Sequence, residues 1–136
     1  LRRQRQMCIR DRYIFYDKES IPDASLRDIA YLNEMRQLNK DYPYDPDIAA
    51  LYAGSYMSIR RWDYWDKNGN PKSETLDVAE ALERVISSGQ SHPGVFHLHI
   101  HLIEASLEPE RALISANSLE ETVPIVGHIL NINANI

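Results

Sequence analysis

Between Ile21 and Ile136, apolar residues recur every three to four positions, which is the period of an amphipathic α-helix. No run of residues alternates strictly enough between apolar and polar positions to predict a half-buried β-strand. The pattern therefore predicts an all-α fold. We expect helices over about residues 24–39, 46–60, 75–88, 93–105 and 109–121, and a further helix that begins near Val126 and is cut off at Ile136.

Proline, glycine and capping residues mark the predicted boundaries. Asp23 is placed to cap the first helix, and Pro46 suits a first helical turn, where no backbone donor is needed. Gly89 is placed to end the third helix, and Pro124 to end the fifth. The longest break, residues 62–74, combines aromatic residues with turn formers and predicts a loop.

The helical spacing also predicts which apolar side chains face inward. These are Leu26, Ile29, Ala30, Met35 and Leu38 in the first helix, Ile48, Leu51, Tyr52, Tyr56 and Ile59 in the second, Leu76, Ala79, Leu82, Val85 and Ile86 in the third, and Ala112, Leu113, Ala116 and Leu119 in the fifth.

The predicted helices are similar in length and joined mostly by short links that contain proline. Thr75 and Pro109, which begin the third and fifth helices, lie 34 residues apart. This is the period of tetratricopeptide repeats, in which antiparallel helical hairpins stack into a superhelix. The sequence therefore favours stacked antiparallel helical hairpins, that is, a fragment of a TPR-like α-solenoid.

Residues 1–12 differ in composition from the rest of the chain. They read LRRQRQMCIRDR and resemble the peptide produced when a sequencing-library adapter is translated by accident, so we expect a non-native or disordered segment. Residues 13–136 are then one TPR-like domain truncated at both ends. Any targeting signal would have been lost with the native N-terminus, and the sequence predicts no compartment.

Without residues 1–12, the chain is clearly acidic and has no cysteine. The formal charge changes from −5 to −9, which argues against nucleic acid as a partner. Loss of Cys8 removes disulfides and thiolate metal ligands. No apolar stretch is long enough to predict a membrane span.

Two segments resemble a bacterial family of tetratricopeptide-repeat proteins with a histidine-rich second half. YPYDPDIAALYAGSYMSIRRWDYW (residues 42–65) is similar to the family pattern YP-D-D-A-LYAE-LM-LRPWD-W, and HPGVFHLHIHLIEASLEPERAL (residues 92–113) is similar to HPG-H-IH-EAS-PERAL. Gly127 and His128 continue the match, whereas Gly54, Arg61, Asn131, Asn133 and Asn135 depart from it. The resemblance implies a helical-repeat fold and no particular reaction.

A cluster of histidines forms the main candidate for chemistry. On a helical wheel, His97, His101 and Glu104 share a narrow stripe of a helix that is otherwise apolar, which predicts a buried polar stripe. One interpretation is a hydrogen-bond network that fixes the register between hairpins. The other is a site for a divalent metal such as zinc, with His128 as the fourth ligand.

Other polar and aromatic residues have simpler interpretations. His99 lies on the opposite side of the wheel and is expected to be a packed core residue, and His92 is expected to cap a helix. Trp62 and Trp65 could form a recognition surface or could fill space beneath the 62–74 loop. The acidic and amide residues of that loop do not have the spacing of an EF-hand.

The sequence contains no glycine-rich phosphate loop, no Gly-x-Ser-x-Gly motif and no cysteine nucleophile outside residues 1–12. We therefore expect a non-enzymatic scaffold that binds a protein or peptide on its concave face and needs no cofactor. The alternative is a metal-binding or metal-dependent hydrolase-like protein that uses His97, His101, Glu104 and His128. Uncapped ends, with Leu119, Ile125, Ile129 and Ile132 partly uncovered, also predict self-association.

Overall fold

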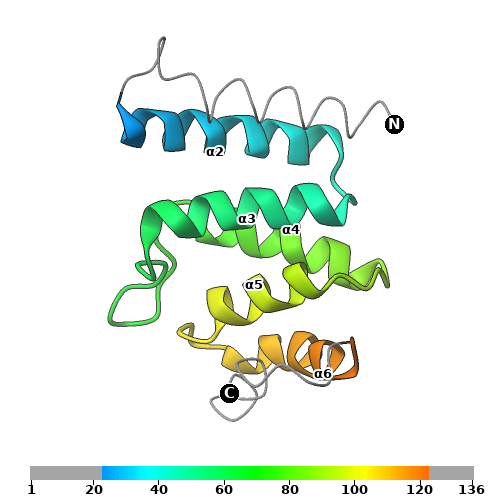
Figure 1. Ribbon diagram of the computed structural model, residues 1–136. Helices are drawn as coiled ribbons and strands as arrows, with labels where there is room; N and C mark the ends of the chain where they lie inside the picture. The colour runs from blue at the N-terminus through cyan, green and yellow to red at the C-terminus, as the bar shows by residue number, and fades with distance from the viewer. Residues whose placement is uncertain (1–22, 123–136) are drawn as a thin grey trace.

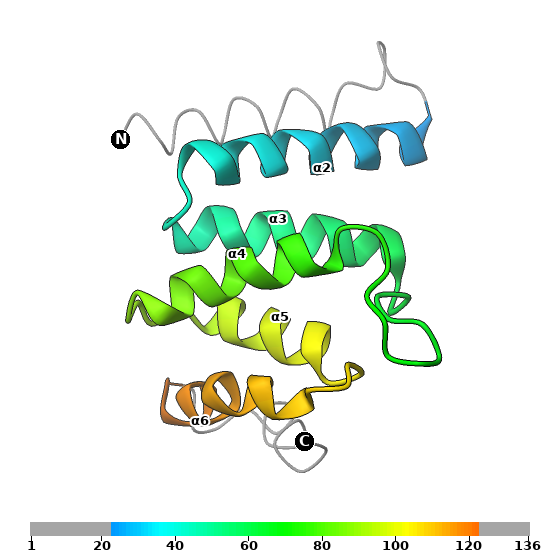
Figure 2. The same ribbon diagram turned by 180° about the vertical axis from the view of Figure 1, so that it is seen from behind.

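The computed structural model describes residues 23–122, and within them the fold is all-α. The elements are α2 (Ala24–Asp41), α3 (Pro46–Arg60), α4 (Thr75–Ser87), α5 (Pro93–Ile103), a 3₁₀ turn η1 (Pro109–Ala112) and α6 (Leu113–Thr122). The predicted sixth helix lies outside the described residues. Successive helices run antiparallel and stack as helical hairpins, as Figures 1 and 2 show from opposite sides.

The helix starts follow from local chemistry. The carboxylate of Asp23 accepts a hydrogen bond from the backbone N–H of Ser25, 2.8 Å away. Oδ1 of Asp45 accepts from the N–H groups of Asp47 and Ile48 at the start of α3. At the start of α5, ring atom Nδ1 of His92 accepts from the N–H of Val95. Each cap satisfies a donor that has no partner within its helix, so the predicted capping roles of Asp23 and His92 are confirmed.

The core runs continuously through the stack. The largest buried side chains from successive helices include Met35, Ile48, Tyr56, Leu82, Ile100 and Leu119. Helix α3 is central because it contacts α2, α4 and α5. Among the described helices, none is both long and apolar enough to cross a membrane.

Four residues that the helical wheel places inward are substantially exposed, namely Leu26, Ile29, Leu76 and Leu113. The first two lie in α2, where no residue before Tyr31 is buried. A wheel gives angles around one helix and does not say how far a neighbouring helix covers it. Leu119 shows the converse error, because it is buried rather than partly uncovered. Ile125, Ile129 and Ile132 lie outside the described residues.

The loop between α3 and α4 is held down by buried hydrogen bonds. The hydroxyl of Thr75 lies 2.7 Å from that of Tyr56 and donates to the backbone carbonyl of Tyr64. Gly69 has a φ of +77°, and a Cβ there would approach Cγ of Leu107 to 2.4 Å. The backbone conformation therefore favours glycine at this turn, whereas the exposed side chain of Leu107 could rotate away from a Cβ.

Candidate functional site

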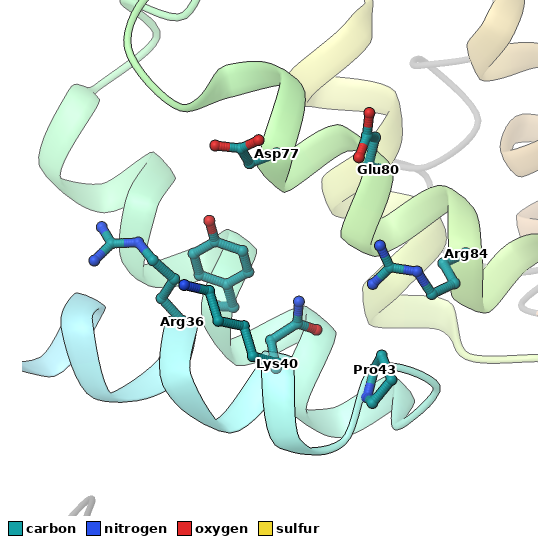
Figure 3. A pocket seen from close by; sticks show the side chains of 8 residues that line it. Arg36, Lys40, Pro43, Asp77, Glu80 and Arg84 are labelled. Atoms are coloured by element: carbon teal, nitrogen blue, oxygen red, sulfur yellow. The ribbon is translucent and has the colours of Figure 1, made fainter.

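The main candidate site is a polar groove between α2 and α4, with α3 beneath it (Figure 3). Its cavity volume is about 510 Å³. The lining residues come from segments that are far apart in the sequence: Arg36, Asn39, Lys40, Pro43, Tyr52, Asp77, Glu80 and Arg84. We call this cavity the α2/α4 groove.

Beside the groove, Glu74 joins three helices through one carboxylate. Arg36 of α2 donates to both oxygens of Glu74, with its Nε 2.8 Å from Oε2 and its Nη2 2.7 Å from Oε1. The hydroxyl of Tyr52 on α3 donates to the same Oε2 at 2.9 Å. Glu74 itself immediately precedes α4. This partly buried ion pair fixes the spacing between the walls of the groove.

The protonation states of these groups follow from their contacts. The hydrogen bond from Arg36 holds the pKa of the Glu74 carboxyl below its usual range, against the opposing effect of burial. Burial, together with the neighbouring Glu74, raises the pKa of the Tyr52 hydroxyl. Glu74 is therefore an acceptor and Tyr52 a donor at neutral pH, and the charge of Arg36 is already compensated.

Four other charged side chains line the groove and have no compensating partner among the described residues. Lys40 on α2 and Asp77, Glu80 and Arg84 on α4 make no side-chain hydrogen bond or ion pair with any residue between 23 and 122. Figure 3 shows Lys40 on one wall and the two carboxylates on the other. These groups are available to a ligand of mixed charge.

Asn39 is the one lining residue whose burial requires explanation. Its side chain is only 7% exposed, and its Oδ1 atom is enclosed without a hydrogen-bond partner among the described residues. An enclosed amide oxygen without a partner costs about 1–3 kcal/mol relative to a satisfied one. Asn39 lines the groove, and rotation of its amide toward the cavity would let a hydrogen-bond donor from outside satisfy this enclosed oxygen.

The histidine stripe predicted from the sequence is brought together, but it is not buried. His97, His101 and Glu104 are all partly exposed, on the side of α5 that faces Trp62. Atom Nδ1 of His101 lies 3.0 Å from Oε1 of Glu104. The rings of His97 and His101 meet edge to face, with their centroids 4.6 Å apart. The expectation of a buried stripe is wrong because the neighbouring helices pack on the other side of α5.

The metal interpretation names four ligands, of which His97, His101 and Glu104 lie among the described residues. Within residues 23–122, no three histidine, cysteine or acidic side chains form a group that could hold a metal ion. His128, the fourth ligand of that interpretation, lies outside the described residues.

The buried polar network lies on the opposite side of α5, around His99. This ring is 1% exposed, with Nδ1 2.8 Å from the hydroxyl of Ser115 and Nε2 3.2 Å from Oε1 of Glu83. Arg111 donates to the same carboxylate oxygen from its Nη2, at 2.7 Å. Because a carboxylate only accepts, Nε2 is the donor in the neutral ring and Nδ1 accepts from Ser115.

The His99 network connects α4, α5, η1 and α6. It therefore fixes the register between the last hairpins, which is the role that the sequence predicted for His97 and His101. The hydrogen bond with His99, followed by Arg111, lowers the pKa of Glu83, against the opposing effect of burial. The prediction that His99 is a packed core residue is confirmed.

The two tryptophans of the loop have different environments. Nε1 of Trp65 donates to the backbone carbonyl of Leu102 at 2.6 Å, so Trp65 anchors the loop to α5. Trp62 is 63% exposed, has a φ of +73°, and contacts the ring of His101 edge to face. Trp65 therefore fills space beneath the loop, and Trp62 stays accessible.

Sequence reasoning missed the α2/α4 groove entirely. One signal was present, because Asn39 lies seven residues after Leu32 and four after Met35 and so continues the buried stripe of α2 with a polar side chain. The charged residues gave no such signal, because exposed charges on a helix are ordinary. The pairing of α2 with α4 across the groove cannot be read from either helix alone.

Comparison of the chain with protein-family models, with curated proteins and with solved structures finds no match.

Proposed function

We propose that this chain is a helical-repeat scaffold that binds a protein or peptide segment in the α2/α4 groove. The observation that carries the proposal is Asn39, which lines the groove and whose enclosed Oδ1 atom has no partner among the described residues. We place here the concave binding face predicted from the sequence. The 34-residue separation of Thr75 and Pro109, which begin α4 and η1, supports a tetratricopeptide-like repeat.

A peptide segment fits the chemistry of this groove better than an apolar ligand does. The lining is dominated by charged and amide side chains, with Pro43 and the ring of Tyr52 as its apolar contributions. A peptide backbone offers an N–H donor at almost every residue, and one of these would satisfy Asn39. The Arg36–Glu74–Tyr52 interactions hold the walls in place before binding, which lowers the entropic cost of association.

The proposal is tested by selecting binders from a randomised peptide library and comparing the wild-type protein with Asn39→Ala. We expect affinity for the selected peptides to fall about 3- to 10-fold in the variant, as loss of one hydrogen bond would produce. The free energy of unfolding in urea should stay the same or rise, because the substitution removes an enclosed amide without a partner.

The matched control is Asn117→Ala, which removes an exposed amide on α6, away from the groove. Its peptide affinity should equal that of the wild type, and its stability should be equal or slightly higher, because alanine favours a helix more than asparagine does. A fall in stability without loss of peptide affinity in Asn39→Ala would show that Asn39 is a structural residue and would contradict the proposal. Failure to select any peptide that depends on Asn39 would also contradict it.

A further inference from the structure

The uncompensated charges of the groove have a definite order along its walls. On α4, the carboxylates of Asp77 and Glu80 come first and the guanidinium of Arg84 follows, all three on the groove side. On α2, Lys40 supplies the uncompensated charge, since Arg36 is engaged by Glu74. The α4 wall is thus acidic and then basic, and the α2 wall opposite is basic (Figure 3).

An extended peptide in such a groove turns alternate side chains toward opposite walls. Side chains two residues apart face the same wall and are separated by about 6.6 Å. Glu80 and Arg84, one helical turn apart, differ by about 6 Å along the axis of α4. The spacing of an extended strand therefore matches the spacing of opposite charges on the α4 wall.

Resting on the proposed function above, we propose that the groove recognises an extended segment containing one basic residue next to two consecutive acidic residues, in either chain direction. The basic side chain lies against Asp77 and Glu80. The middle, acidic side chain faces Lys40 across the groove, and the last one reaches Arg84. The amide of Asn39, whose enclosed Oδ1 has no partner between residues 23 and 122, turns toward the segment and accepts one of its backbone N–H groups. The ends of the peptide play no part in this recognition.

The test is a selection from a randomised peptide library displayed between fixed flanks, so that no free terminus is offered. The expected result is enrichment of the basic–acidic–acidic triplet over its permutation, acidic–basic–acidic. Acetylated and amidated synthetic peptides of the two orders then provide affinities. The triplet order should bind at least about fivefold more tightly, the effect of one exposed ion pair. In the same register the permuted order places an acid against Asp77 and Glu80 and a base opposite Lys40, and a shifted register leaves Arg84 without its acid.

A charge exchange sharpens the test. Lys40→Glu should lower the affinity for the Lys-Glu-Glu peptide about fivefold or more. It should raise the affinity for a Lys-Lys-Glu peptide, whose middle side chain now faces an acid. Lys67→Glu, which makes the same charge change on the exposed loop, is the control and should change neither affinity. Both substitutions are at exposed side chains without described partners, so folding should be retained.

The outcomes separate this inference from the proposed function. Peptides that bind in an Asn39-dependent manner without the charged triplet, or without a response to Lys40→Glu, would overturn the charge pattern and leave peptide binding intact. Absence of any Asn39-dependent binder would overturn both. An equal response to Lys40→Glu and Lys67→Glu would show attraction by net charge only, and it would also overturn the pattern.

Discussion

Helix α5 carries histidines on two opposite sides, and the two sides have different environments. His99 is enclosed and has both ring nitrogens within hydrogen-bond distance of partners on other elements, Glu83 on α4 and Ser115 on α6. His97 and His101 are partly exposed, and the hydrogen bond of His101 goes to Glu104, three residues along the chain. The first arrangement ties helices together, whereas the His101–Glu104 hydrogen bond is local to the end of α5.

This difference shows how a ring's contribution to stability depends on what it connects. Removing a partner from an enclosed network leaves other buried groups without hydrogen bonds. Removing a partly exposed ring lets water replace it at little cost. The stability effects of substitutions along α5 should therefore differ sharply with side, although all three residues are histidines within five positions of each other.

The largest expected effect is that of His99→Ala, which should lower the free energy of unfolding by about 2–4 kcal/mol. The substitution creates a cavity and leaves the buried hydroxyl of Ser115 without its partner. Urea denaturation gives the value. His97→Ala, on the other side of the same helix, should cost less than about 1 kcal/mol. Equal losses in the two variants would contradict the distinction between the sides.

A second effect is loss of stability in acid through the Glu83 carboxyl. Its pKa is lowered in the folded protein, from the ordinary value of 4.5, by the hydrogen bond with His99 and then by Arg111. A lowered carboxyl pKa means stabilisation that is present above the unfolded-state value and lost as the pH falls through the folded-state value. Stability should therefore decline below about pH 4.5.

The variant Glu83→Gln should flatten this decline, as measured by urea denaturation at a series of pH values. Glu74→Gln is a useful comparison, because Arg36 lowers the pKa of Glu74 in the same direction, and the hydrogen bonds of Glu74 go to α2 and α3 instead of α5. Each single variant should remove part of the acid dependence, and the double variant should remove more. An unchanged slope in Glu83→Gln would place the acid sensitivity elsewhere.

These contrasts also show which features the sequence could predict. The start of α3 at Pro46 and its end at Arg60 match the expected bounds, because proline at a first turn and the sequence pattern that follows are local signals. The wheel of α5 correctly placed His99 opposite His97 and His101. It could not say which side is buried, because that depends on where α4 and α6 pack.

The groove illustrates the same limit. Lys40 and Glu80 are forty residues apart, and only the stacking of the hairpins places them on facing walls. In the sequence, a charged residue that lines a groove cannot be distinguished from one that faces open solvent. Asn39 is the one groove residue that the sequence could have indicated, since a polar residue on a buried stripe needs a hydrogen-bond partner.

A smaller effect is expected for His101→Ala, about 0.5–1 kcal/mol in the free energy of unfolding. The His101 ring packs edge to face with the rings of Trp62 and His97 and hydrogen-bonds to Glu104, so the substitution loses some packing. Among the described residues, Trp62 and Glu104 both keep access to water, so neither is left buried without a hydrogen bond. A loss as large as that of His99→Ala would show that the exposed side carries a network of its own.

The smallest expected effect is that of added metal, which should leave the melting temperature of the full chain unchanged with zinc, nickel or manganese. A bound metal would raise stability by RT ln(1 + [L]/Kd), about 2.7 kcal/mol at a hundredfold excess over Kd, which corresponds to several degrees. Atom Nδ1 of His101 already lies 3.0 Å from Oε1 of Glu104, and within residues 23–122 no three histidine, cysteine or acidic side chains form a group that could hold a metal ion. Differential scanning fluorimetry with and without chelator measures the response. A chelator-reversible rise in melting temperature that disappears in both His97→Ala and His101→Ala would contradict this expectation. The partly exposed side of α5 would then be a metal site.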